Sequence, residues 1–272
     1  MPDAFATPPF HRLLLTGAAG GLGRELRRRL PAHCDLLRVS DIAPLGAAAA
    51  REEVVQADLA DAGAVRALVD GVDAVVHMGG VSTEQPWEAI LPANIVGAYN
   101  LYEAVRRAGV KRVVFASSNH VTGFYRQDEV IPAGAPPKPD GLYGLSKAFG
   151  EDLAQLYFDR HGIETVSLRI GSSFDKPRDR RMLHTWMSFD DMERLVLAAL
   201  GAKDVGHSII CGVSANPHVW WDNAPAAHIG YVPRDSSAPF VDEIERTTPP
   251  GDPADPAVIY QGGAFVKQGP GR

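Results

Sequence analysis

The stretch LLLTGAAGGLGRELRRRL, residues 13–30, joins an apolar run to a helical pattern through a loop rich in glycine. Gly17, Gly20 and Gly23 follow the apolar run directly, and the helical pattern begins within the loop. Glycines here let the backbone turn tightly and approach a pyrophosphate, while the helix N-terminus offers free N–H groups and a positive dipole end. The spacing is GxxGxxG and not the commoner GxGxxG. The strand before the loop and the helix after it therefore carry the prediction of dinucleotide binding.

Short apolar runs and amphipathic segments alternate along most of the chain. The runs lack a clean period of two, which is typical of strands in a parallel sheet that helices cover on both faces. The expected strands are residues 12–16, 35–39, 53–57, 74–78, 112–117, 165–170 and 207–213. The expected helices are residues 21–30, 62–70, 87–108, 142–161 and 189–200. This order predicts an α/β fold with a Rossmann-like, doubly wound parallel sheet.

Two aspartates follow later strands, where the adenosine part of a dinucleotide would lie. Asp41 comes after the second strand, roughly 20 residues beyond the glycines, where an acid binds the ribose hydroxyls. An acid at this place repels a 2′-phosphate, so the sequence predicts NAD in preference to NADP. Asp58 and Leu59, after the third strand, are expected beside the adenine, although an aspartate in such a place is more often an ordinary turn residue.

The alternation of strands and helices loosens after residue 171. We therefore expect an NAD-binding Rossmann domain over residues 1–172. Residues 173–272 are expected to form a small C-terminal substrate-binding region that is integrated with the first domain into a single structural unit.

Composition limits what the protein can bind. The 272 residues include 27 Lys and Arg against 33 Asp and Glu, a net charge of −6. Nucleic-acid-binding proteins usually need a basic face to neutralise phosphates. No apolar stretch approaches the length of a membrane span, and no signal-peptide pattern precedes the first strand. Cys34 and Cys211 are expected to be buried thiols in a reducing compartment. We expect a cytoplasmic protein without nucleic-acid or membrane partners.

A tyrosine and a lysine lie four residues apart in DGLYGLSKAFGED, on one face of an expected helix. Free tyrosine has a pKa of about 10 and is a poor base at neutral pH. The ammonium of Lys147 would stabilise the phenolate of Tyr143 and bring its pKa toward the working range. This spacing is common by chance, so the dinucleotide loop earlier in the chain is what makes it informative.

Polar residues end the strand that precedes this helix. Ser118, Asn119 and His120 lie at the carboxyl edge of a central strand, where open α/β sheets bind ligands. Ser118 could hydrogen-bond the reacting oxygen beside Tyr143. The alternatives are serines that merely cap the strand and a buried structural histidine.

Several motifs together resemble a known family. TGAAGGLG, FASSNH and YGLSK resemble the extended short-chain dehydrogenase/reductase family, which includes NAD-dependent sugar epimerases and dehydratases. VVHMGGVS, ANIVGAYNLYEA, PDGLYGLSKAFGE, RRMLHTW, WWDN and QGGAFV, spread over nearly the whole chain, resemble the members of that family that oxidise uronic acids. The resemblance implies oxidation of D-galacturonate or D-glucuronate at C1, by hydride transfer to NAD, giving an aldarolactone.

The resemblance also implies roles for single residues. Tyr143 would be the general base, Lys147 its partner and a contact of the nicotinamide ribose, and Ser118 would orient the C1 hydroxyl. Asn94 is similar to the asparagine that anchors the active-site helix. The residues expected around the cofactor are Gly17, Gly20, Gly21, Leu22, Gly23, Asp41, Asp58, Leu59, Asn94 and Lys147. Those expected around the sugar acid are Ser82, Ser118, Asn119, His120, Tyr143, Ser172, Arg181 and Phe265.

Four basic residues lie in KPRDRRMLHTW, residues 176–186. Arg181 begins the family-like part of this stretch, and an arginine can bind a carboxylate through a bidentate fork that lysine cannot match. We expect Arg181 to bind the C6 carboxylate of a sugar acid. The other three basic residues are expected on a solvated loop, paired with nearby aspartates: Lys176, Arg178 and Arg180 with Asp175 and Asp179.

Three other functions share much of this pattern. A nucleotide-sugar epimerase or dehydratase has the same first domain but generally a larger C-terminal domain. A non-catalytic NAD-binding sensor usually lacks the Tyr/Lys pair, and a dehydrogenase of neutral aldoses would not need Arg181. No His/Cys/Asp cluster has metal-ligand spacing, so no metal is expected. Apolar positions in 94–107 and 143–157 exceed the needs of one sheet face, which predicts a homo-oligomer, a dimer or larger.

Overall fold

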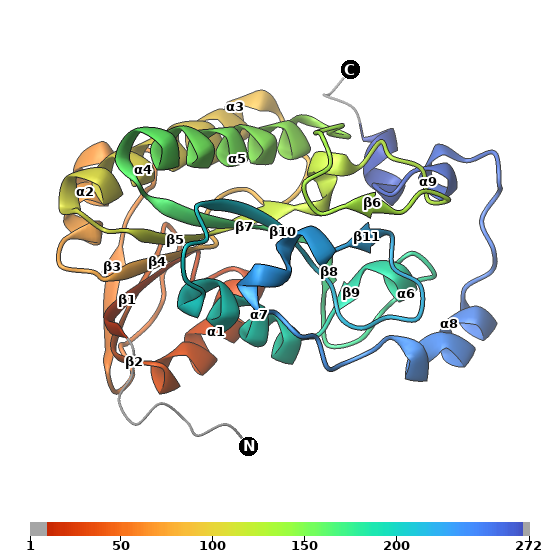
Figure 1. Cartoon of the computed structure of the whole chain (residues 1–272), viewed down its shortest axis with the longest axis horizontal. Coiled ribbons are helices and arrows are strands. Elements are labelled where there is room, and N and C mark those ends of the chain that lie inside the picture. Colours follow the sequence, from red (N-terminus) through yellow and green to blue (C-terminus); the bar gives the residue numbers. More distant parts are fainter. Residues whose placement is uncertain (1–9, 269–272) are drawn as a thin grey trace.

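The computed structural model describes residues 10–268 of the chain, and its centre is a parallel sheet (Figure 1). The strands of this sheet are β1 (Phe10–Thr16), β2 (Cys34–Asp41), β3 (Glu52–Gln56), β4 (Ala74–His77), β5 (Arg112–Ser118), β7 (Glu164–Ile170) and β10 (His207–Gly212). They lie in the order β10-β7-β5-β4-β1-β2-β3, and all neighbours are parallel. The strand order therefore reverses between β1 and β4, which is where such sheets bind ligands.

Helices cover both faces of the sheet. The helices α1 (Gly21–Arg29) and α7 (Phe189–Gly201) share one hydrophobic core with the sheet, and α2 (Ala62–Val69), α4 (Gly97–Ala108) and α5 (Leu142–His161) share the other. Figure 1 shows these two layers on opposite sides of the strands. In β1, Leu13 and Leu15 face the first core, while Leu14 faces the second. Strands buried on both faces explain the continuous apolar runs, and the predicted fold class is confirmed.

The helix expected over residues 87–108 is interrupted. It consists of α3 (Trp87–Ile90), a π turn η2 (Leu91–Val96) and α4. Pro92 lies at the start of the π turn, and proline lacks the N–H that an α-helix needs at an interior position. Such π turns often lie at functional sites, and this one carries the buried Asn94.

Most of the remaining elements form a rim at the carboxyl ends of the strands, whereas η1 (Leu30–Ala32) joins α1 to the start of β2. Two small parallel pairs join β6 (Ile131–Pro132) to β11 (Trp221–Asp222) and β8 (Ser172–Ser173) to β9 (Trp186–Met187). The helices of the rim are α6 (Met182–Thr185), α8 (Val241–Thr247) and α9 (Pro256–Ile259). Short helical turns are η1, η3 (Asn119–Thr122), η4 (Ala224–Ile229), η5 (Ala238–Phe240) and η6 (Gly263–Lys267). The part of the chain after residue 172 thus adds β10 to the sheet, and the domain boundary there stays a prediction.

A buried ion pair connects the rim to the sheet. Arg169 of β7 donates from Nε and Nη2 to the two carboxylate oxygens of Glu151 in α5, over 2.9 and 2.7 Å. Its Nη1 donates to the carbonyls of Ala133 and Ala135 in the loop after β6, over 3.0 and 2.8 Å. Ser117 donates to the same glutamate over 2.5 Å. Every polar group of this cluster has a partner, which is the condition under which buried charges are tolerated.

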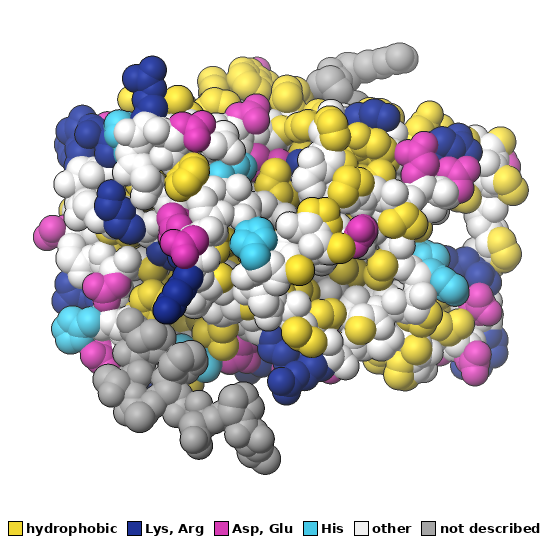
Figure 2. Space-filling model, viewed as in Figure 1, with side chains coloured by type: hydrophobic (Ala, Val, Ile, Leu, Met, Phe, Trp, Pro, Cys, Tyr) yellow, Lys and Arg dark blue, Asp and Glu magenta, His cyan; other side chains and the backbone are white. Residues whose placement is uncertain are grey.

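The surface carries mixed charges. On the face shown in Figure 2, Lys and Arg side chains are interspersed with Asp and Glu, and no extended basic area gathers among the described residues of that face. Each helix within residues 10–268 is too short or too polar to cross a membrane. Cys34 and Cys211 are both free and buried, as expected.

Candidate active site

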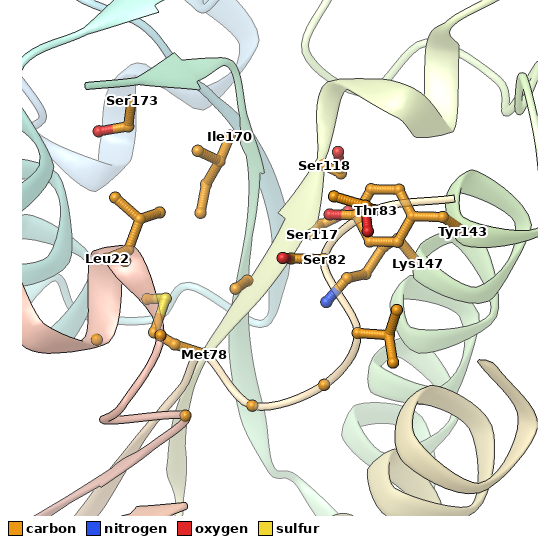
Figure 3. Close-up of a pocket in the computed structure, with 18 of the residues that line it drawn as sticks. Leu22, Met78, Ser82, Thr83, Ser117, Ser118, Tyr143, Lys147, Ile170 and Ser173 are labelled. Carbon is orange, nitrogen blue, oxygen red and sulfur yellow. The ribbon is translucent and has the colours of Figure 1, made fainter. Parts of the chain in front are cut away.

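A cavity of about 870 Å³ lies at the carboxyl ends of the central strands. Figure 3 shows Leu22 of α1 on one side of it and Tyr143 and Lys147 of α5 on the other, with Ser117 and Ser118 at the end of β5. All but one of the residues expected around cofactor and substrate line this cavity: Gly17, Gly20, Gly21, Leu22, Gly23, Asp41, Asp58, Leu59, Ser82, Ser118, Asn119, His120, Tyr143, Lys147, Ser172, Arg181 and Phe265. The exception is Asn94.

The glycine loop is tightly packed against its neighbours. Gly17 has a φ of +71°, and a Cβ there would lie 2.5 Å from the backbone carbonyl carbon of Met78. A Cβ at Gly23 would overlap the carbonyl oxygen of Gly17. Among residues 10–268 no side chain caps the N-terminus of α1, and no acidic residue lies in its first turn. The N–H groups of that turn and the positive dipole end therefore face the cavity as an anion site.

The two aspartates, Asp41 and Asp58, both line the cavity. The carboxylate of Asp41, at the end of β2, accepts hydrogen bonds from Ala19 N and Ala43 N, both over 2.9 Å. This ties the glycine loop to the end of the neighbouring strand. Asp58 accepts from Ala60 N over 2.8 Å, so it also orders its own turn.

Tyr143 and Lys147 face the cavity from the first two turns of α5, and both are almost fully buried. Burial raises the pKa of Tyr143 to about 12, while its hydrogen bond with Ser118 acts in the opposite direction. Burial lowers the pKa of Lys147 to about 8. The Lys147 ammonium lies 5.8 Å from the centre of the Tyr143 ring. This is the residue pair that can hold and stabilise a phenolate, with Ser118 beside it.

The start of α5 depends on a residue that the sequence pattern did not indicate. Glu84, in the loop after β4, accepts from Leu142 N over 2.9 Å and from Tyr143 N over 2.8 Å. Its carboxylate therefore caps α5 and fixes the turn that carries the tyrosine. Glu84 precedes the tyrosine by about sixty positions, so no local spacing could have indicated this contact.

We expect Lys147→Met to stabilise the fold at pH 7 by about 3 kcal/mol, because it removes a buried charge. The pKa of Lys147 falls from its ordinary value of 10.5 to about 8 on folding. The unfolded chain therefore binds more protons than the folded chain between pH 8 and 10.5, and the wild type regains stability across that window. The difference between variant and wild type should shrink from pH 8 to 10.5.

Urea denaturation at several pH values measures this difference. The exposed Lys111 provides the control, because Lys111→Met removes no buried charge. A stability difference for Lys147→Met that stays constant from pH 7 to 10 would contradict the assignment of a buried, easily deprotonated lysine.

Asn94 connects three segments instead of lining the cavity. Its Oδ1 accepts from Val81 N over 2.7 Å, and its Nδ2 donates to Val81 O over 3.0 Å and to Ser146 Oγ over 2.8 Å. All polar atoms of its side chain are thus used inside the protein. The anchoring contact to α5 is present, whereas a contact of Asn94 with the cofactor stays a prediction.

Arg181 lines the cavity beside Ser172 and Asn119. It donates to Gln261 O over 2.7 Å and to Ser172 Oγ over 3.2 Å. With the Asn119 amide oriented to donate to Ile170 O, its oxygen also accepts from Arg181 over 2.7 Å. Within residues 10–268 no carboxylate lies within 4.0 Å of this guanidinium. Burial lowers its pKa to about 10.

The other three basic residues differ from the prediction. Lys176 pairs with Glu243 of α8 over 3.3 Å, and Arg180 donates to Thr248 O over 2.7 Å and pairs with Glu245. These two side chains hold α8 against the loop before α6. The predicted pairing with nearby aspartates is therefore wrong for Lys176 and Arg180. Arg178 does pair with Asp175, over 3.6 Å.

Arg178 is also not simply solvated. Its guanidinium lies 3.9 Å from the centre of the Phe174 ring, and both residues line the cavity. Its side chain remains 58% exposed, which places it at the mouth of the cavity and not in the wall beside Tyr143.

Several known proteins are similar to this chain in sequence and in structure. Residues 13–188 match the NAD dependent epimerase/dehydratase family. The uronate dehydrogenase of Pseudomonas putida is 58% identical over 97% of this chain and 98% of its own. The crystal structure of glucuronic acid dehydrogenase from Chromohalobacter salexigens has a TM-score of 0.93 at 54% identity, over 95% of this chain and 97% of that one.

A mutant uronate dehydrogenase from Agrobacterium tumefaciens, complexed with NAD, has a TM-score of 0.92 at 50% identity. The alignment covers 94% of this chain and 97% of that one. Both the match over more than half of the chain and the full-length similarity lead to one assignment. The chain belongs to the NAD-dependent epimerase/dehydratase family.

Proposed function

We propose that this protein oxidises a uronic acid, D-galacturonate or D-glucuronate, at C1 with NAD and forms the aldarolactone. The proposal rests on Arg181, a partly buried guanidinium without a carboxylate partner among residues 10–268, in the same cavity as Tyr143 and Lys147. A sugar acid can present a carboxylate to one end of this cavity and an anomeric hydroxyl to the other. The full-length similarity to uronate dehydrogenases supports this choice of substrate.

The residues of the cavity fit NAD. The uncapped first turn of α1 suits a pyrophosphate, and the close packing at Gly17 and Gly23 leaves no room there for side chains. Asp41 suits the ribose hydroxyls and disfavours a 2′-phosphate, while Asp58 and Leu59 would flank the adenine. NAD, when bound, supplies the acceptor for the hydride that leaves C1.

The catalytic roles follow from the chemistry of three side chains. Tyr143, as phenolate, accepts the proton of the C1 hydroxyl as the C1–H bond breaks. Lys147 stabilises that phenolate by its positive charge. This stabilisation has to offset the increase in the pKa of Tyr143 that burial causes. Ser118 holds the reacting oxygen in place. Because the ring oxygen of the sugar takes no part, C1 becomes the carbonyl carbon of a lactone, and one proton is released to solvent.

D-Galacturonate deuterated at C1 tests this proposal. Incubation with NAD should give NADH that carries the deuterium, together with a lactone that has lost one deuterium and one hydrogen relative to the labelled sugar acid. Appearance of unlabelled NADH, or a product altered at C4 or C6, would contradict oxidation at C1.

Gly23→Ala is expected to weaken NAD binding at least tenfold, because a Cβ at this position would overlap the carbonyl oxygen of Gly17 and displace the phosphate loop. Gly201→Ala is the matched control, since nothing lies within 4 Å of a Cβ built there. Isothermal titration with NAD compares the two variants with the wild type. Equal affinity for NAD in all three proteins would show that the glycine loop does not take part in cofactor binding.

We also infer that the protein acts in the cytoplasm as a homo-oligomer that associates through α4 and α5. Tyr99 of α4 and Leu145 and Leu156 of α5 are about half exposed, although each is large and apolar. A second copy packed on these two helices would cover them. Light scattering after size-exclusion chromatography is expected to give a dimer or larger, and a monomer at micromolar concentration would rule this interface out.

A further inference from the structure

A histidine and an aspartate form a buried pair beside the catalytic tyrosine. His120 Nδ1 lies 2.7 Å from Asp140 Oδ2, and the two side chains are 10% and 1% exposed. His120 belongs to η3, directly after β5, and Asp140 lies just before α5. The imidazole lines the cavity, and its Nε2 has no hydrogen-bond partner among residues 10–268.

Three glycines close around the carboxylate of Asp140. A Cβ at Gly123 or at Gly262 would overlap Oδ2, and a Cβ at Gly144 would lie 3.2 Å from Oδ1. The other carboxylate oxygen, Oδ1, is buried without a hydrogen-bond partner among the described residues. The packing thus leaves His120 as the side chain that hydrogen-bonds this carboxylate.

The imidazole plane is also fixed. Phe265 stacks on His120 with ring centres 3.8 Å apart and an interplanar angle of 22°. The Tyr143 ring meets it edge-on at 5.8 Å. Because Nδ1 is bonded to Asp140 and Phe265 covers one face, Nε2 is the ring nitrogen that stays available to a ligand.

The pair determines which ring nitrogen carries the proton. A carboxylate only accepts hydrogen bonds, so Nδ1 must donate and must hold the proton. In a neutral imidazole the other nitrogen, Nε2, is then an acceptor. Burial lowers the pKa of His120 and so favours the neutral form, although Asp140 acts in the opposite direction.

We propose that Asp140 is a positioning residue that sets the tautomer of His120, so that Nε2 faces the sugar acid as a hydrogen-bond acceptor. This inference rests on the proposed function. A lone pair at Nε2 attracts a sugar hydroxyl and repels a carboxylate, whereas Arg181 attracts the carboxylate. His120 and Arg181 would therefore bind opposite ends of the substrate and orient C1 toward Tyr143.

The first test needs neither substrate nor a change of Asp140. Long-range ¹H–¹⁵N spectra of the histidine-labelled protein at pH 8 distinguish a protonated from a bare ring nitrogen. The signal of His120, one of nine histidines, is assigned by its loss in His120→Gln. We expect a protonated Nδ1 and a bare Nε2. A protonated Nε2 in the wild type would overturn the proposal, whether or not uronates prove to be substrates.

The second test changes Asp140. In Asp140→Ala the proton should move to Nε2, where the cavity can solvate it, and the KM for galacturonate should rise at least tenfold. The Kd for NAD should stay within twofold, because the glycine loop is untouched. Asp140→Asn keeps the shape of the side chain, but its amide can donate as well as accept. We expect mixed tautomers and an intermediate KM.

Asp35→Ala is the matched control. His11 Nδ1 lies 2.7 Å from Asp35 Oδ2, the same distance as in the buried pair, but both side chains are largely exposed. This variant should leave KM, kcat and the His120 signal unchanged. An increase of KM in Asp140→Ala or Asp140→Asn with no change in the His120 tautomer would show that Asp140 acts by packing alone and would overturn the proposal.

Discussion

Tyr143→Phe is expected to lower kcat for uronate oxidation by on the order of 10³-fold, the usual contribution of a positioned general base. The phenylalanine ring can keep the contacts that Tyr143 makes with His120 and Phe265, so the cavity should retain its shape. The Kd for NAD and the KM for the sugar acid should change little. Steady-state kinetics and isothermal titration with NAD measure these quantities separately.

Tyr157→Phe provides the matched control for this prediction. Tyr157 lies on the same helix, but its hydroxyl donates to Glu103 and it does not line the cavity. Its loss should leave kcat unchanged. If Tyr143→Phe kept more than a tenth of the wild-type kcat, another group would have to accept the proton, and the role assigned to Tyr143 would be wrong.

Arg181→Ala is expected to weaken uronate binding in the reacting complex by about 2–4 kcal/mol, the loss typical of a buried, hydrogen-bonded charge pair. The effect should appear mainly in KM, because the carboxylate lies away from the C1 atom. Arg181→Lys should recover only part of it, since an ammonium cannot form the bidentate contact. Thermal unfolding should accompany the kinetics, because Arg181 also donates to Gln261 O and Ser172.

Arg178→Ala provides the control for the Arg181→Ala prediction. Arg178 lines the mouth of the same cavity but is more than half exposed, so its removal should alter KM little. Equal effects of the two substitutions, both abolished by salt, would mean that the basic segment attracts anions as a whole. The account of Arg181 as a single carboxylate-binding residue would then fail.

The fold could be predicted from the sequence because the apolar runs match strands that are buried on both faces of a parallel sheet. In β1, consecutive leucines pack alternately into the two hydrophobic cores, and this is why the strand is an unbroken apolar run. The ends of β1, β2, β4, β5 and β7 all lie at one edge of a parallel sheet. Residues just after each strand were therefore expected to meet, and they do line one cavity.

The contacts that could not be predicted join residues distant in sequence. Glu84 caps α5, Glu151 neutralises Arg169, and Asp140 binds His120, yet none of these pairs has a spacing that a helix or a strand would mark. Each depends on how helices and loops that are distant in sequence pack against one another and against the sheet. The same is true of Lys176, whose partner on α8 lies 67 residues along the chain.

The proposed reaction is the oxidation of a free sugar acid with NAD in the cavity that holds Tyr143 and Arg181. The most direct measurement compares initial rates of NADH formation from D-galacturonate, D-glucuronate, D-galactose and UDP-glucuronate under identical conditions. We expect turnover of both uronates with kcat/KM at least about 100-fold above that of D-galactose, because only the acids engage Arg181. We also expect no turnover of UDP-glucuronate. A rate with D-galactose equal to that with D-galacturonate, or a preference for the UDP-sugar, would contradict the proposed reaction.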